Sequence, residues 1–192
     1  MINSFGSTAI AGYSAGMRIE SLSIVPMLAM GNAMSTFTAQ NMGAGKIDRV
    51  KEGYRMCYVI VLTAGAVLCV MYQLAGGAFV SLFLDSGSSE AYSVGLSYVK
   101  FLSFFYSFIG LKASTDGLLR GAGDVTAFTV ANLVNLAIRV SVTNLFAPIY
   151  GIQVAWMAVP LGWAANYVIS FGWYLTGKWK KVRVIKTVSY TH

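Results

Sequence analysis

Three ionisable side chains follow one another at four-residue intervals within an apolar part of the sequence. They are Lys112, Asp116 and Arg120. On an α-helix this spacing places them on one face, with the carboxylate between two cations. In an apolar environment such a carboxylate can take up and release a proton or a small cation, and Lys112 would adjust its charge. The same spacing also fits an intrahelical ladder of salt bridges in which Lys112 extends toward a membrane surface.

A second polar group consists of Asn132, Asn135, Arg139 and Thr143, which are separated by steps of three, four and four residues. These steps produce one polar stripe along an otherwise apolar helix. Lipid cannot satisfy the hydrogen-bonding groups of such a stripe. The stripe therefore faces either a water-filled cavity or neighbouring helices with which it forms hydrogen bonds.

A third group combines amides, a hydroxyl and thioethers on one predicted helix. Asn32, Thr36 and Gln40 are spaced i, i+4 and i+8, and Met30 and Met34 lie beside them. Flexible thioethers suit pockets that accept many apolar shapes, although methionines at helical spacing are also typical of ordinary packing. The candidate substrate or ion pathway therefore consists of Lys112, Asp116, Asn132, Asn135, Arg139, Asn32, Thr36, Gln40, Met30 and Met34.

The residues that enzymes use for hydrolysis or metal binding are scarce in this sequence. The single histidine is His192, and the two cysteines, Cys57 and Cys69, lie inside one apolar stretch. Zinc sites, Cys–His nucleophiles and Ser–His–Asp triads therefore lack their components. We predict no catalytic residues, no metal site and no cofactor.

The composition is that of a membrane protein. Of the 192 residues, 56% are hydrophobic and only 11% are charged, and the mean hydropathy is +0.63. Three stretches without any charge, residues 21–45, 56–84 and 140–177, each exceed the roughly 20 apolar residues that cross a bilayer as a helix. The sequence therefore predicts an all-α polytopic membrane protein, and it excludes soluble enzymes, nucleic-acid binders and secreted disulfide-rich domains.

Glycine, proline and polar clusters divide the chain into five predicted transmembrane helices. We expect them at about residues 8–41, 54–84, 90–119, 125–147 and 152–176, within one transmembrane domain over residues 1–180 and a basic tail over residues 181–192. Ten of the fourteen Lys and Arg residues lie within residues 46–55, at Arg120 or within residues 178–186. By the positive-inside rule these parts are cytoplasmic and the N-terminus is outside, as in a multi-pass plasma-membrane protein.

Four stretches of the sequence resemble the C-terminal half of transporters of the multidrug and toxic compound extrusion (MATE) family. They are residues 6–21, 38–50, 117–125, and 132–140 together with 147–157. The most specific element is Gln-Asn-Met-Gly-Ala-Gly-Lys at 40–46, followed by a basic stretch, and the next is Leu-Arg-Gly-Ala-Gly-Asp at 119–124. The resemblance covers nearly all of residues 2–180.

The resemblance implies a protein of twelve helices in two six-helix lobes, which exports organic cations and similar amphiphiles in exchange for Na⁺ or H⁺. The five predicted helices would be the second to sixth helices of the second lobe, so its first helix and the whole first lobe would be missing. The expected partners are membrane lipid, an N-terminal lobe or a second chain, and a small organic cation, with no nucleic acid. We expect the fragment to be inactive alone.

One departure from the family pattern concerns the coupling ion. Some branches of the family carry an acidic residue about three turns before the Leu-Arg-Gly turn, whereas residues 107–110 contain no acid here. A lipid-linked sugar flippase of the same superfamily is an alternative function. A membrane interaction protein without transport activity, or the remnant of a broken gene, is another.

Overall fold

The computed structural model describes residues 7–84, 89–151 and 153–181, and it is built from helices throughout these ranges. This confirms the expected all-α fold class. The predicted tail, residues 181–192, lies outside the described residues except for Lys181. The helices in chain order are α1 (Ser7–Gly43), α2 (Ile47–Ser81), α3 (Ser89–Ser103), α4 (Tyr106–Gly121), α5 (Val125–Tyr150), α6 (Gln153–Leu175) and the short 3₁₀ helix η2 (Lys178–Lys181).

The main difference from the expected helices is that residues 90–119 form two helices, α3 and α4, whose axes differ by 52°. The reason lies in the last turn of α3, where the carbonyl oxygen of Lys100 accepts hydrogen bonds from Gln73 Nε2 at 2.9 Å and Ser103 Oγ at 2.7 Å. Side chains that bond a helical carbonyl compete with the backbone ladder. The helix consequently breaks at Phe104 and Phe105, and the amide of Phe105 bonds to Leu102 instead.

Two other helix boundaries also differ from the sequence prediction. Helix α2 begins at Ile47 rather than near residue 54, so the basic residues of the predicted connection lie on its first turns. Helix α5 continues past Pro148 to Tyr150 and ends at Gly151, whose φ of 87° is accessible to glycine. Pro148 is tolerated because it lies in the last turn of the helix, where the loss of one backbone hydrogen bond has little effect on the helix before it.

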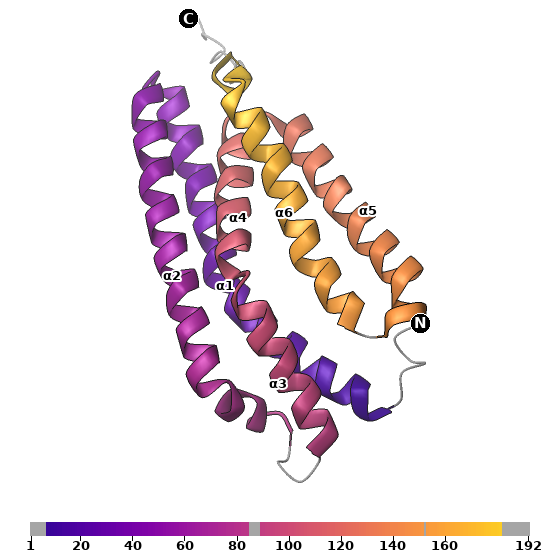
Figure 1. Cartoon of the computed structure of the whole chain (residues 1–192). Coiled ribbons are helices and arrows are strands. Elements are labelled where there is room, and N and C mark those ends of the chain that lie inside the picture. Colours follow the sequence, from indigo (N-terminus) through magenta and orange to yellow (C-terminus); the bar gives the residue numbers. More distant parts are fainter. Residues whose placement is uncertain (1–6, 85–88, 152, 182–192) are drawn as a thin grey trace, which may run out of the picture.

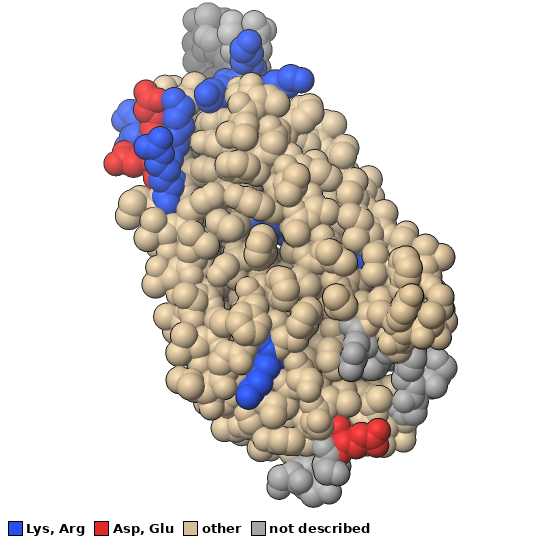
Figure 2. All heavy atoms as spheres, in the orientation of Figure 1, with Lys and Arg blue, Asp and Glu red and all other residues tan. Residues whose placement is uncertain are grey.

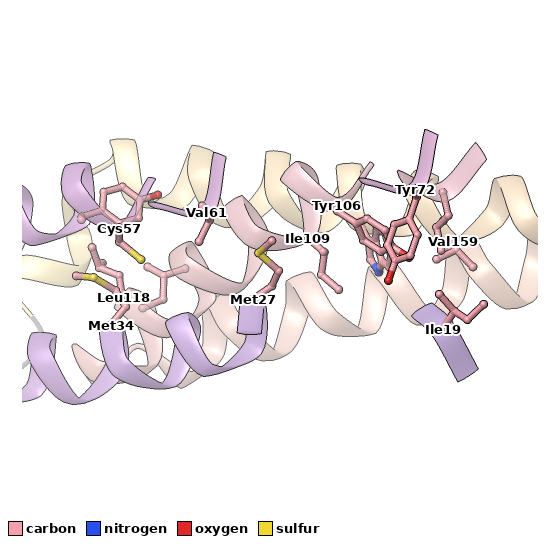
Figure 3. Packing of buried hydrophobic residues seen from close by; sticks show 14 of the residues in the cluster. Ile19, Met27, Met34, Cys57, Val61, Tyr72, Tyr106, Ile109, Leu118 and Val159 are labelled. Carbon is pink, nitrogen blue, oxygen red and sulfur yellow. The ribbon is translucent and has the colours of Figure 1, made fainter. Parts of the chain in front are cut away.

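Helix α4 forms the centre of the bundle (Figure 1). It packs against α1, α2 and α6, and every residue from Ala113 to Leu119 is buried. The core is continuous along its length, and Figure 3 shows residues such as Met27 of α1, Val61 of α2 and Ile109 of α4 in one cluster. Helix α5 contacts mainly α6, so these two helices form a hairpin on one side of α4.

The outer surface of the helices is apolar. Leu74 is 84% exposed and Leu22 is 67% exposed, and both lie on long helices. Figure 2 shows most of the visible Lys and Arg side chains at the end of the molecule where α2 begins, and few charged atoms across the middle of the visible face. An apolar band between polar ends is what a bilayer requires, so the chain is a multi-pass membrane protein.

Three helices, α1, α2 and α5, are each long and apolar enough to cross a membrane, and the bent pair of α3 and α4 passes the same test together. Within the described residues, the predicted fifth span, α6, is not in this set. The count of five spans stays a prediction.

Candidate functional site

Three small residues bring α4 into close contact with α1. A Cβ atom built on Gly117 would lie 2.1 Å from the carbonyl oxygen of Gly31, and one built on Gly121 would lie 2.2 Å from that of Ser35. Only glycine allows two helix backbones to approach this closely. The Gly117-x-x-x-Gly121 spacing is therefore a helix-packing motif, and it places the polar face of α4 next to α1.

The polar face of α4 carries a buried hydrogen-bonded ion pair. Lys112 Nζ donates to Asp116 Oδ2 at 2.8 Å, and the two side chains are only 13% and 5% exposed. Asn132 of α5 contacts both partners, because its Oδ1 accepts from Lys112 Nζ at 3.1 Å and its Nδ2 donates to Asp116 Oδ2 at 3.3 Å. Ser170 Oγ of α6 donates to the other carboxylate oxygen, Asp116 Oδ1, at 2.6 Å.

These four side chains form one network that joins three helices. Burying a single charge is very costly, but here the carboxylate and the ammonium neutralise each other, and polar groups satisfy both. We call Lys112, Asp116, Asn132 and Ser170 the Asp116 network. Because the network is neutral as a whole, it can lie within an apolar bundle.

The Asp116 network borders an open pocket of about 260 Å³ between α1, α4 and α5. Asp116, Lys112 and Asn132 line it from one side, and Asn32 and Arg120 line it from another. Arg120 Nη2 donates to Asn32 Oδ1 at 2.7 Å, and the guanidinium lies 5.7 Å from the centre of the Phe128 ring. The pocket therefore has a carboxylate, two cations and two amides within reach of a small ligand.

One buried polar atom beside the network lacks a partner among the described residues. Asn166 is fully buried, its Oδ1 accepts a hydrogen bond from Ser170 Oγ at 3.4 Å, and its Nδ2 bonds to no atom in this part of the chain. Asn166 lies four residues before Ser170 on α6, so it is on the same helix face. An unpaired polar atom in such a place is a common sign of a ligand or ion that the site accepts.

The structure divides the predicted ladder of Lys112, Asp116 and Arg120. Lys112 and Asp116 form the expected pair, but Arg120 bonds to Asn32 and Ser35 of α1 and makes no salt bridge within the described residues. The predicted ladder therefore has one salt bridge instead of two, although all three side chains line the same pocket. The close approach of α1 at Gly121 supplies oxygen acceptors that Arg120 reaches instead.

The predicted stripe on α5 is also divided. Asn132 belongs to the Asp116 network, whereas Asn135 and Arg139 lie against Gly162 of α6, where a Cβ atom would be 2.3 Å from Asn135 Oδ1 and 2.9 Å from Arg139 Cγ. Asn135 Oδ1 has no hydrogen-bond partner in the part of the chain described, and Arg139 is exposed. These two residues do not line the pocket beside Asp116.

The predicted group on α1 lies on two faces of that helix. Met30 and Met34 line a separate apolar pocket of about 290 Å³ between α1 and α2, and Met34 is buried. Asn32 lines the pocket beside Asp116, while Thr36 and Gln40 are exposed on the surface of α1. The thioethers and amides therefore do not form one site.

Ser170 and Asn166 are the main residues that sequence reasoning missed. Both lie in an apolar helix at a four-residue interval, and this signal was available in the sequence. A second missed cluster joins α2, α4 and α6. Thr115 Oγ1 of α4 lies 2.7 Å from Tyr54 Oη and 2.9 Å from Tyr58 Oη of α2, and Tyr58 Oη donates to Tyr167 Oη of α6 at 3.3 Å. The cluster is next to the Asp116 network along α4, since Thr115 directly precedes Asp116.

Comparison with known proteins gives consistent matches over the chain. The family profile MatE matches residues 1–157. The probable multidrug resistance protein YpnP of Bacillus subtilis is 28% identical over 185 residues, which are 96% of this chain and 41% of YpnP. The probable multidrug resistance protein NorM of Thermotoga maritima is 22% identical over 189 residues, which are 94% of this chain and 39% of NorM.

A solved structure has the same fold as this chain. It is described as the inward-facing conformation of a multidrug resistance MATE family transporter of the MOP superfamily, and it matches with a TM-score of 0.79 and 18% sequence identity. The match covers 88% of this chain and 38% of that one. The chain therefore has the fold of part of such a transporter, and it spans less than half the length of the curated relatives that it matches.

Proposed function

This chain belongs to the MatE family, and from that premise we propose that it is one lobe of a secondary active multidrug efflux antiporter. The transporter would export organic cations and amphiphiles in exchange for Na⁺ or H⁺. The order of the four sequence stretches that resemble the family supports the C-terminal lobe. It acts by binding and moving solutes, with no chemical reaction and no cofactor apart from the coupling ion.

The observation that supports this proposal most is the buried Asp116 beside an open pocket. Ionisable groups within the membrane are costly, and they are typical of ion and substrate pathways. Asp116 is 4% exposed, its ion-pair partner Lys112 lies beside it, and both line the pocket between α1, α4 and α5. A carboxylate in this position can exchange a proton with the pocket.

A second lobe is needed for transport in this proposal. Alternating access requires two lobes that move against each other around a site between them. The exposed amides Asn32 and Gln40 of α1 and the exposed Arg139 of α5 cannot be satisfied by lipid. They would face an N-terminal lobe or a second chain in the plasma membrane, with the end of the bundle that carries η2 in the cytoplasm and the N-terminus outside.

An efflux assay tests this function directly. Cells that express this chain together with the N-terminal half of YpnP are expected to extrude ethidium, whereas cells that express the chain alone are not. Separate changes of the Na⁺ and pH gradients identify the coupling ion. Extrusion by the chain alone would contradict the need for a second lobe.

The Asp116→Asn substitution tests the role of the carboxylate in the same cells. We expect it to lower the efflux rate at least tenfold when the rate is divided by the amount of protein in the membrane. Asp48→Asn is the matched control, because Asp48 pairs with Lys51 at 2.7 Å and its side chain is 95% exposed. Equal efflux by the Asp116→Asn and Asp48→Asn variants would contradict the proposal.

One observation favours a second candidate function, a lipid-linked sugar flippase. The pocket beside Asp116 is lined by two cations, Lys112 and Arg120, and by one carboxylate. An excess of positive charge suits a phosphate-bearing ligand, which arginine binds in a bidentate manner. Transfer of a fluorescent polyprenyl diphosphate sugar across vesicles, in the absence of ethidium efflux, would favour this function. A chain that supports neither activity with a partner lobe would be a membrane interaction protein or a gene remnant.

A further inference from the structure

The ammonium group of Lys112 lies where a free cation would bind. Its nearest oxygen atoms are Asp116 Oδ2 at 2.8 Å and Asn132 Oδ1 at 3.1 Å, and these atoms belong to two different helices. Lys112 reaches this position from one helical turn before Asp116. The positive charge is thus held by oxygen ligands within the bundle and is only 13% exposed.

The side chains around Lys112 Nζ resemble the ligand set of a hard cation. Carboxylate, amide and hydroxyl oxygens are the groups that such cations prefer. Asp116 and Asn132 supply the first two kinds, and Ser170 Oγ lies 2.6 Å from the other oxygen of Asp116. Since the site contains a single carboxylate, one positive charge neutralises it, and a monovalent cation fits this charge balance.

Asn166 is an independent sign that the site has unused ligand capacity. Its amide is fully buried, and one of its two polar atoms has no partner within the described residues. The oxygen and nitrogen of an amide exchange places when the side chain turns about its last torsion. Asn166 can therefore bond to Ser170 through its nitrogen and leave its oxygen free for a ligand.

We propose that Lys112 is the built-in occupant of a monovalent-cation site formed by Asp116, Asn132, Ser170 and Asn166. While the ammonium is in place, the site takes no Na⁺. When the lysine charge is removed, the same oxygen ligands bind Na⁺. This inference concerns binding within the chain, so it does not depend on the proposed transport function.

The Lys112→Met substitution tests the inference, because methionine retains much of the length of lysine but has no charge. We compare thermal unfolding of the purified full chain in detergent, in choline chloride and in NaCl at equal ionic strength. The midpoint of the Lys112→Met variant is expected to rise by about 4 °C and to saturate as Na⁺ replaces choline, because ligand binding stabilises the folded state. The wild-type midpoint is expected to be the same in both salts.

Two further variants serve as matched controls. Lys112→Met/Asp116→Asn has neither charge, so its midpoint is expected to be independent of Na⁺. Lys112→Arg retains the cation, and it is expected to behave as the wild type. A Na⁺-dependent rise in the wild type that Asp116→Asn abolishes would overturn the proposal, as would a folded Lys112→Met variant that does not respond to Na⁺.

Failure of the single variant to fold also gives a clear result. If Lys112→Met is unfolded in both salts while Lys112→Met/Asp116→Asn is folded, the freed carboxylate has bound no cation and the proposal is wrong. A second measurement needs no variant to fold. The ¹⁵N resonance of the Lys112 ammonium in the wild-type chain is expected to stay unchanged when NaCl replaces choline chloride, and a saturable change with Na⁺ would overturn the proposal.

Discussion

Helices α4 and α5 differ sharply in how much of their surface is buried. Helix α4 is buried on all sides from Ala113 to Leu119, and glycine brings its backbone against that of α1. Helix α5 buries only Ala127, Ala131 and Ala147, and the rest of its side chains are partly or largely exposed. Figure 1 shows the same difference, with α4 among its neighbours and α5 at the edge of the bundle.

This difference in burial distinguishes residues that hold the bundle together from residues that lie exposed at its edge. Residues at the α1–α4 contact hold the bundle together, since a change there disturbs two backbones at once. Most side chains of α5 are exposed at the edge of the bundle, so their polar groups are available to water or another protein. Asp116 connects the two regions, because it lies on α4 and bonds to Asn132 of α5 and Ser170 of α6.

The largest effect is expected when that connection is broken. The Asp116→Ala substitution leaves the Lys112 ammonium buried without its carboxylate, which we expect to lower the free energy of unfolding by about 3–5 kcal/mol. Chemical unfolding of the purified chain in detergent measures this loss. The Asp48→Ala variant, which breaks an exposed pair, is expected to unfold as the wild type does. Equal stability of both variants would mean that the network does not connect the two regions.

The next largest effect is expected at the α1–α4 contact itself. In the Gly117→Ala variant the new methyl group would overlap the carbonyl oxygen of Gly31, so the helices must separate. We expect a loss of about 1–3 kcal/mol in the free energy of unfolding. Gly172→Ala on α6 is the control, because no atom lies within 4 Å of its Cβ position. A neutral Gly117→Ala variant would show that this contact is looser than the structure indicates.

A smaller effect is expected at the start of α5. Asp124 is the N-cap of this helix and accepts from the amide of Ala127 at 3.3 Å and from Trp173 Nε1 at 2.6 Å. The Asp124→Ala variant is expected to lose about 1 kcal/mol of stability, as is usual when an N-cap is removed. Asp124→Asn retains an acceptor and should lose less. Thermal unfolding followed by tryptophan fluorescence compares the two variants, and identical midpoints would exclude a role for the cap.

The smallest effect is expected on the open face of α5. Arg139 is exposed and makes no salt bridge within the described part of the chain, so the Arg139→Gln substitution should change the stability of the isolated chain by less than about 0.5 kcal/mol. The same variant is expected to weaken association with a partner lobe, as measured by co-purification. A strongly destabilised Arg139→Gln chain would show that α5 is not an open face.

Helical spacing predicted the contact of the site that lies within one helix, but it did not predict the contacts between helices. The four-residue interval predicted the Lys112–Asp116 pair, because both residues lie on one helix and the interval alone brings them together. The same rule was wrong for Arg120, since Asn32 and Ser35 of another helix offered acceptors within reach. The break at Phe104 was missed for a similar reason, because it involves Gln73 of α2.

The amino-acid sequence by itself determined that this chain is helical, lies in a membrane and carries polar side chains within its apolar helices. These properties depend on hydropathy and periodicity, which act along a single stretch of chain. Only the tertiary structure decided which polar side chains meet, since the approach of α1 at Gly117 and Gly121 and the packing of α5 and α6 bring together residues far apart in sequence. A buried charge is stable only where such neighbours neutralise and hydrogen-bond it, and the position of those neighbours is a property of the packed bundle.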